Sequence, residues 1–398
     1  MSHGHNPGDT HEVDADAMVA RRVRILLVAV LAPLLALTLV GVVLLWPDHQ
    51  VKADALQTAK ARGLVLSVEP CPQRPEECDR ARVQVTAGEG KGTEVYARAV
   101  RHPLIPRVKA GNRILMQVIP QAEPDERYKY VDQDRGRPLL LLAVLFMSAV
   151  IALSRWRGVA ALGALAITAV VFTQFMMPAI LDGSDPLLVA VVGSFVIMGV
   201  TLLLTHGLNA RTAISVVGTA GALVLTGALG ELFVHLSRIS GLADNGASEV
   251  ASYVPGGVDL RALVVAGLVI GALGVLDDVT VTQTAAVWEL SAANPAASRG
   301  ELLAAGLRIG RSHVPSVVNT LVLAYAGAAL PLLMLFAIQG TPDVYVVSTE
   351  QVAIQVVNGL VGSLGIIAAV PLTTALAAAA VAHRSESLPV PGDAVDPG

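Results

Sequence analysis

Two adjacent carboxylates, Asp277 and Asp278, lie well inside a long apolar stretch of the sequence. The polar side chains of Thr280, Gln283 and Thr284 follow shortly after them. One aspartate at the centre of a membrane helix costs roughly 2.5 to 3.5 kcal/mol on insertion scales, so such residues usually face a bundle interior or a water-filled path. Carboxylate and hydroxyl oxygens suit hard cations, and a carboxylate can also carry a proton. The spacing therefore predicts a cation or proton site within a helical bundle.

The helical period divides these side chains between two neighbouring faces. At about 100° per residue, Asp277, Thr280 and Thr284 share one face, whereas Asp278 and Thr282 share the next. We favour a functional role for the carboxylate pair, with Asp277 ahead because its face is lined with hydroxyl groups. The alternative is that both aspartates are solvated structural residues near a cytoplasmic helix end.

Glu231 and Asn319 are further candidates for the same pathway. Glu231 pairs with His235 at i, i+4 spacing near the end of an apolar stretch, and Asn319 lies early in a later stretch. An interfacial position for Glu231 and an interhelical hydrogen bond for Asn319 are equally good interpretations. Such bonds contribute only about 0.6 kcal/mol on average in membranes.

The composition indicates a membrane protein. Of the 398 residues, 54% are hydrophobic and 15% are charged, whereas soluble proteins average about 25% charged residues. Roughly 20 apolar residues span a bilayer as a helix. We expect about eight spans, at residues 25–46, 138–154, 158–180, 187–205, 213–236, 262–288, 314–338 and 352–382. The predicted fold is an all-α polytopic bundle, with an anchor at 25–46 and seven helices in 138–384. The anchor is expected to stay uncleaved because its apolar run exceeds the roughly 7–15 residues of a signal peptide.

The distribution of arginine predicts the orientation. Short cytoplasmic loops collect Lys and Arg. With the N-terminus inside, the cytoplasmic loops hold Arg155, Arg157, Arg211, Arg299, Arg308, Arg311 and Arg384, and the outer short loops hold only Arg238 and Arg261. We therefore predict a bacterial plasma-membrane protein with both termini, including the tails 1–24 and 385–398, in the cytoplasm.

Residues 47–137 differ in character from the apolar runs around them. Short alternating segments are separated by turn-forming clusters, which predicts about five strands in a small barrel or sandwich. This β-rich domain would lie outside the cytoplasm, between the first and second spans. Cys71 and Cys78, the only cysteines, fall within it, and that compartment permits a disulfide. Two reduced thiols in an apolar site are the alternative.

Three blocks of the helical region carry a family resemblance: Gly271–Glu289, Glu301–Arg311 and Asn319–Pro331. They are similar to the YibE/F family of bacterial membrane proteins, over about residues 25–384 and most specifically over 264–333. The resemblance implies an anchor, an extracytoplasmic segment and a helical bundle. The family pattern usually carries a single Asp, so which of Asp277 and Asp278 corresponds to it stays open. Its members are described as predicted permeases or uncharacterised proteins, which implies an architecture more than a substrate.

The expected function is a permease or secondary transporter of an ion or small solute. One alternative is a non-transporting scaffold or receptor that works through the β-rich domain. A lesser one is the membrane subunit of an ATP-driven importer, with Glu301–Gly306 as the loop offered to an ATPase. Nucleotide-binding Gly-rich loops and paired Cys/His zinc spacings are absent from the sequence. We expect no enzyme activity, cofactor, bound metal or nucleic-acid partner. The expected partners are the lipid bilayer and the solute, and a homo-oligomer is left open.

Overall fold

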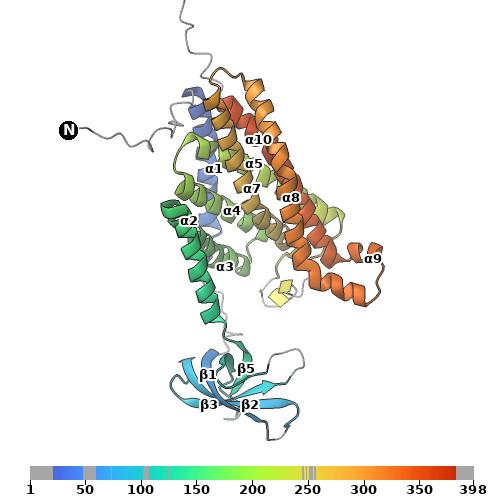
Figure 1. Ribbon diagram of the computed structural model, residues 1–398. Helices are drawn as coiled ribbons and strands as arrows, with labels where there is room; N and C mark the ends of the chain where they lie inside the picture. Colours follow the sequence, from blue (N-terminus) through green and yellow to red (C-terminus); the bar gives the residue numbers. More distant parts are fainter. Residues whose placement is uncertain are drawn as a thin grey trace, which may run out of the picture. The chain divides into compact units, whose positions relative to one another are not determined.

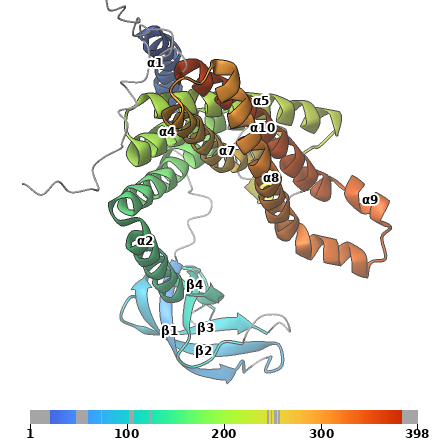
Figure 2. The same cartoon turned by 45° about the horizontal axis from the view of Figure 1, so that its top comes forward.

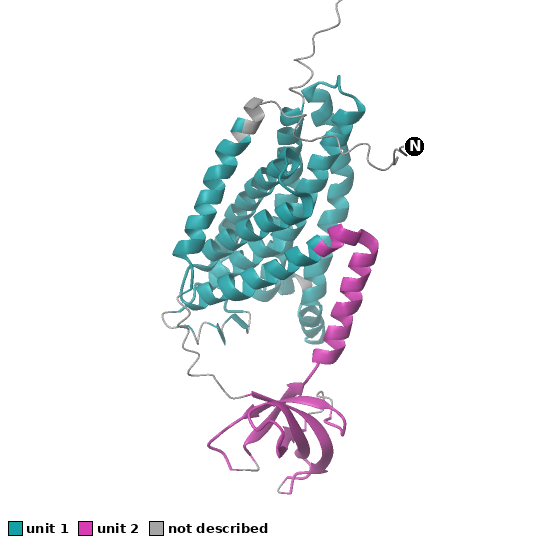
Figure 3. Ribbon diagram, turned by 90° about the vertical axis from the view of Figure 1, so that its left-hand side faces the viewer, with its two compact units in different colours: residues 1–51, 160–398 teal, residues 52–159 magenta. Residues whose placement is uncertain are grey.

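The chain forms two compact units, residues 1–51 with 160–398 and residues 52–159 (Figure 3). The computed structural model describes residues 21–47, 60–72, 74–101, 107–123, 126–243, 246–247, 249–250, 254 and 257–381. Residues 1–20 and 385–398 of the predicted tails lie outside the described residues. We call the first unit the helical unit and the second the barrel unit.

Long apolar helices make up most of the described chain (Figure 1). They are α1 (Arg21–Leu44), α2 (Gly136–Val171), the π-helical turn η2 (Phe172–Met176), α3 (Met177–Leu181), α4 (Pro186–His206), α5 (Ala210–Leu236), α7 (Leu260–Ala293), α8 (Arg299–Ile338), α9 (Asp343–Ser348) and α10 (Glu350–Val381). Seven helical stretches among the described residues are long and apolar enough to cross a membrane, by length and composition.

The difference between seven stretches and the eight expected spans comes from one junction. The expected spans 138–154 and 158–180 fall within a single helical stretch of 46 residues, Gly136–Leu181. As one straight helix at 1.5 Å per residue it would be about 69 Å long, more than twice the roughly 30 Å of a bilayer core. Arg155 leaves the helical region of backbone space, with φ 51° and ψ −127°. The stretch is therefore two helical arms joined where the sequence predicts a short loop.

The start of α8 corrects the prediction that Glu301–Gly306 lies in a loop. Ser298 caps the helix, because its hydroxyl accepts the Glu301 N–H while the Glu301 carboxylate accepts the Ser298 N–H at 2.8 Å. Leu302, Gly306 and Gly310 are buried on one side of this extension. The predicted loop was therefore wrong, since a capped segment with one buried face continues the helix for several turns. The importer hypothesis loses the loop on which it rested.

Two apolar clusters form the core of the helical unit, in which α5, α7 and α10 lie together (Figure 2). The first cluster contains Leu223, Leu276 and Ile366, together with residues of η2 and α4. The second contains Ile214 and Trp288, near the start of α5 and the end of α7, with the last turns of α10. Each of these three helices therefore passes through both clusters.

The barrel unit confirms the expected small β-domain of five strands. They are β1 (Lys60–Pro70), β2 (Cys78–Gly88), β3 (Glu94–Val100), β4 (Arg113–Val118) and β5 (Tyr128–Gln133). They close in the order β1-β2-β3-β5-β4, with β3 and β5 parallel and the other pairs antiparallel. This is the strand order of the Greek-key barrel called the OB-fold. Alternating inward side chains such as Val83, Ala97 and Met116 fill its own core.

A disulfide joins Cys71 and Cys78, whose Cα atoms are 5.5 Å apart. It closes the connection between β1 and β2, where the Cys71 N–H also donates to the Cys78 carbonyl at 3.1 Å.

Replacing both cysteines with serine is expected to destabilise the barrel unit by about 2 kcal/mol, from the entropy of closing a loop this short. The measurement is the protease resistance of the barrel segment in the full-length protein, with the oxidised parent as reference. Equal resistance of the variant and the oxidised parent would show that the crosslink contributes nothing.

Candidate functional site

Hydroxyl groups of α5 and α7 meet inside the helical unit. Thr219 and Thr280 are fully buried, and their Oγ1 atoms are 2.6 Å apart. Ser215 Oγ donates to Thr284 Oγ1 at 3.1 Å. The four side chains form two contacts, stacked one helical turn apart. Removing one partner of such a buried pair leaves an unsatisfied group, which costs about 1–3 kcal/mol.

The direction of these hydrogen bonds follows from the α7 backbone. Thr280 Oγ1 donates its single proton to the Asp277 carbonyl at 3.0 Å, and Thr284 Oγ1 donates to the Thr280 carbonyl at 2.8 Å. Thr280 and Thr284 must then each accept a hydrogen bond from the α5 hydroxyl opposite, because a hydroxyl has one proton and two lone pairs. The hydroxyl protons of these side chains are then all donated, whereas lone pairs of their oxygen atoms remain available. Such a group of oxygens suits a cation better than an anion.

Gln283 extends the contact to two further helices. Its side-chain amide donates to the Gly306 carbonyl of α8 at 2.6 Å and to Thr374 Oγ1 of α10 at 2.9 Å. Thr374 in turn donates to the Val370 carbonyl at 2.6 Å. One side chain of α7 thereby ties together three helices. We call Ser215, Thr219, Thr280, Gln283, Thr284 and Thr374 the polar layer.

Glycines bring the helices close enough for the polar layer to form. A Cβ at Gly306 would lie 2.6 Å from Thr374 Cγ2, and one at Gly310 would lie 3.0 Å from Gln283 Oε1. A Cβ at Gly218 of α5 would collide with Thr373 of α10. Larger residues at these positions would therefore separate the helices.

The polar layer separates the two apolar clusters. On α5 its residues lie between Ile214 of the second cluster and Ala222 of the first, and on α7 between Val287 and Leu276. On α10, Thr374 lies between Ala369 and Ala377 in the same way. Interhelical hydrogen bonds among Ser, Thr and Gln side chains help to hold membrane helices together.

The two aspartates occupy different environments. Asp277 is half-buried next to the polar layer, and its Oδ1 is buried with no hydrogen-bond partner among the described residues. Asp278 is exposed, as is Thr282, whose hydroxyl donates to the Asp278 carbonyl at 2.7 Å. This matches the two faces expected from the helical period. Asp277 is therefore the carboxylate that adds an unused acceptor to the layer.

Not all predicted residues reach the polar layer. Thr280, Gln283 and Thr284 belong to it, with Asp277 beside it, whereas Asn319 of α8 is exposed. Glu231 instead lines a separate cavity of about 220 Å³ with His235, Asp185, Asp259 and Arg261. Asp185 and Asp259 already cap α4 and α7 there.

Sequence reasoning missed the partners on the other helices. Ser215 and Thr219 lie at helical spacing with Thr212 and Thr226 on one buried face of α5. That row of hydroxyls at i, i+3 and i+4 positions was a usable signal. The sequence contains no such signal for Thr374 or for the carbonyl of Gly306, because their role depends on how three helices meet.

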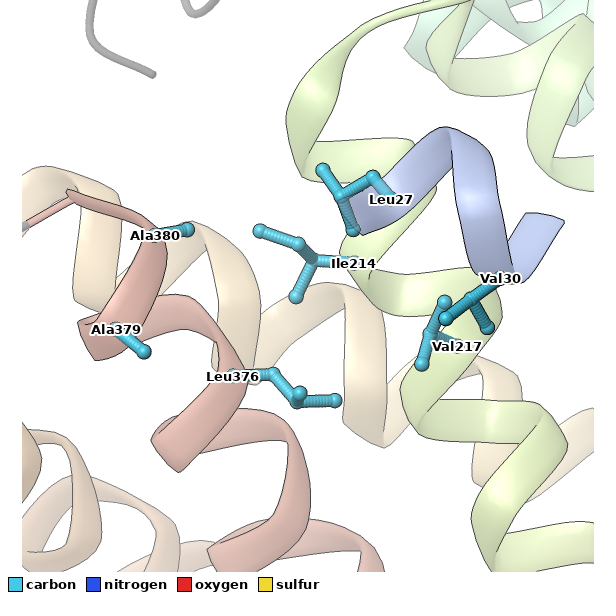
Figure 4. Close-up of a pocket in the computed structure, with 7 residues that line it drawn as sticks. All are labelled: Leu27, Val30, Ile214, Val217, Leu376, Ala379 and Ala380. Atoms are coloured by element: carbon cyan, nitrogen blue, oxygen red, sulfur yellow. The ribbon is translucent and has the colours of Figure 1, made fainter. Parts of the chain in front are cut away.

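A second cavity lies between α1, α5 and α10 and has a different character. Its volume is about 170 Å³, and its lining consists entirely of aliphatic side chains: Leu27, Val30, Ile214, Val217, Leu376, Ala379 and Ala380. These side chains approach one another from the three helices (Figure 4). Without a polar side chain in its lining, this cavity offers no side-chain ligand to an ion.

Gly306→Ala is expected to lower the thermal stability of the helical unit, because overpacking at such a contact costs about 1–3 kcal/mol. The matched control is Gly274→Ala on α7, where a Cβ would meet nothing within 4 Å among the described atoms. Stability is measured in detergent by tryptophan fluorescence in a Trp46→Phe, Trp156→Phe background, in which the fully buried Trp288 is the remaining tryptophan. Equal melting of the two variants would contradict the close approach at Gly306.

The helical unit also carries the similarity to known proteins. The family described as YibE/F-like protein matches residues 142–383, which is more than half of the chain. The matched region includes the whole polar layer and is narrower than the expected 25–384, because α1 and the barrel strands lie outside it. No curated protein and no solved structure matches the sequence. The chain is thus a member of the YibE/F-like protein family.

Proposed function

We propose that this chain is a multi-pass membrane permease that moves a proton or small cation through its helical unit. The polar layer carries the proposal, because six polar side chains are buried between two apolar clusters on helices long enough to cross a membrane. Buried polar residues in such helices commonly mark ion or solute pathways. Asp277 supplies the negative charge, and Thr280 and Thr284 supply neutral oxygens beside it.

A cation fits this layer better than an anion for a reason of hydrogen-bond accounting. The α7 hydroxyl protons are donated to backbone carbonyls, and the Gln283 amide donates to Gly306 and Thr374. An anion would need those donors. A proton or cation needs only the remaining lone pairs and the unpaired Asp277 Oδ1.

The proposed orientation has both termini in the cytoplasm of a bacterial cell. Arg211 at the start of α5 lies 4.0 Å from Glu289 near the end of α7, so these helix ends lie together. Arg299 begins α8 just beyond the end of α7, and basic residues favour the cytoplasmic side. The barrel unit would then lie outside, where the Cys71–Cys78 disulfide is chemically stable.

Flux through purified protein in liposomes tests the proposal, read with dyes for protons and for monovalent cations. Asp277→Asn is expected to reduce flux about tenfold or more, since interactions with a charged group are worth about 1.5–3 kcal/mol. Asp278→Asn is the matched control and is expected to retain most of the flux, because Asp278 is exposed. If both variants keep full flux, Asp277 is not part of the pathway; if the parent shows none, the permease function fails.

A receptor or scaffold function is the second candidate, and the charge of the barrel unit favours it. The OB-fold commonly binds oligomeric ligands on the face of its second and third strands. In this protein that face carries Arg80, Arg82 and Arg98.

Deleting residues 52–135 in the full-length chain separates the two candidates. A permease that uses the polar layer is expected to keep measurable flux without the barrel unit, because every residue of the layer lies in the helical unit. A receptor would lose its cellular effect completely while Asp277→Asn left that effect intact.

A further inference from the structure

Trp288 lies between the polar layer and the end of the helical unit at which α5 begins and α7 ends. It follows Thr284 by one helical turn and is fully buried. It is also the largest fully buried side chain that the structure describes. The other residues of the second apolar cluster are mostly alanine and valine. One indole ring is therefore the main obstacle between the polar layer and this end of the bundle.

The apolar barrier on this side of the polar layer is thin. Ser215 lies about 8 Å along the helix axis from Ala210, the first residue of α5, at 1.5 Å per residue. On the other side, about 26 Å of helix separate Thr219 from Leu236, the last residue of α5. In the proposed orientation the thin side faces the cytoplasm. The shorter way to the polar layer therefore passes Trp288.

Arg211 holds the indole ring in place. Its guanidinium carbon lies 5.9 Å from the centroid of the Trp288 ring, and its Nη1 lies 4.0 Å from Glu289 Oε1. A cation over an aromatic face within about 6 Å is attracted by the ring. Arg211 is partly exposed and Glu289 is exposed. The charged groups that hold the ring are thus accessible from solution, although the ring itself is not.

Two buried donors at this contact have no hydrogen-bond partner among the described residues, Trp288 Nε1 and Arg211 Nε. A buried indole N–H usually finds an acceptor, and leaving it without one costs free energy. The observed position of the ring therefore carries a cost that a position with the N–H in water would not carry. A ring in this situation is suited to two positions rather than one.

The second apolar cluster also has room to rearrange. Ile214 and Ala380 belong to this cluster and also line the aliphatic cavity of about 170 Å³ between α1, α5 and α10 (Figure 4). Protein interiors are otherwise close-packed, with few voids larger than a water molecule. A shift of Ile214 into the cavity would make space in the cluster without separating the helices.

We propose that Trp288 is the cytoplasmic gate of the polar layer and that Arg211 holds it closed. This inference rests on the proposed permease function and assigns the gate to a single side chain. In the closed position the ring separates the polar layer from the cytoplasm. In the open position it leaves the second cluster, and a proton or small cation can reach the layer from that side. Such gating exposes a fixed site to one side of the membrane at a time.

Thiol labelling of a Ser215→Cys variant of the full-length protein tests the gate. Cys71 and Cys78 are joined in a disulfide and are the only cysteines, so the introduced thiol is the only free one. It is labelled with a membrane-impermeant methanethiosulfonate in inside-out and in right-side-out membrane vesicles. Trp288→Ala is expected to accelerate labelling about tenfold or more in inside-out vesicles, because the rate scales with the fraction of open molecules. The rate in right-side-out vesicles is expected to stay unchanged.

Leu276→Ala is the matched control. Leu276 is also fully buried on α7, but it lies on the other side of the polar layer, so labelling from the cytoplasmic side is expected to stay at the parent rate. Trp288→Phe keeps an aromatic ring at the gate and protects the test against a folding artefact. Its labelling rate is expected to lie between those of the parent and Trp288→Ala. Arg211→Gln is expected to accelerate labelling about twofold to fivefold, since one cation–π contact is lost.

An unchanged labelling rate in Trp288→Ala would overturn the gate, as would equal acceleration by Leu276→Ala. Acceleration only in right-side-out vesicles would overturn it as well, because Trp288 would then face the other side. Labelling requires no transport, so the two proposals can fail separately. Flux with unchanged labelling rejects the gate alone, whereas accelerated labelling in a protein without flux rejects the permease and keeps Trp288 as the closure of the polar layer.

Discussion

The helical unit depends on one requirement, that every buried hydroxyl of α5 and α7 find a partner. Thr219 and Ser215 find side-chain partners because α5 lies against Thr280 and Thr284. An unsatisfied buried polar group costs more than a made hydrogen bond returns, so this requirement determines the register of the two helices. Apolar contacts alone would allow several registers, because aliphatic side chains interlock with little directional preference.

The same requirement explains where the chain uses glycine. Gln283 reaches a backbone carbonyl of α8 only because residue 306 has no side chain, and it reaches Thr374 through the same narrow space. Gly306 and Gly310 of α8 therefore serve the polar layer. In the barrel unit the dominant constraint is different, since alternating apolar side chains and strand closure define the fold without a buried polar network.

The features that can be predicted from the sequence are those that belong to a single helix or strand. The hydroxyl face of α7, the exposed position of Asp278 and the five strands follow from periods of 3.6 and 2 residues. Contacts between different helices do not follow from these periods. Thr374 is far from Gln283 along the chain, and nothing in its local sequence indicates the contact. Glu301–Gly306 was assigned to a loop because it falls between two apolar spans, while the Ser298 cap and the buried Gly306 make it part of a helix.

Arg155 interrupts the long helical stretch Gly136–Leu181, which begins in the barrel unit and ends in the helical unit. The helix breaks at this residue, close to the boundary between the two units, and the barrel core contains no residue of the helical unit. The family similarity begins at residue 142, beyond the last barrel strand. The barrel therefore has an apolar core of its own, which shares no residue with the oxygen atoms that face one another inside the bundle.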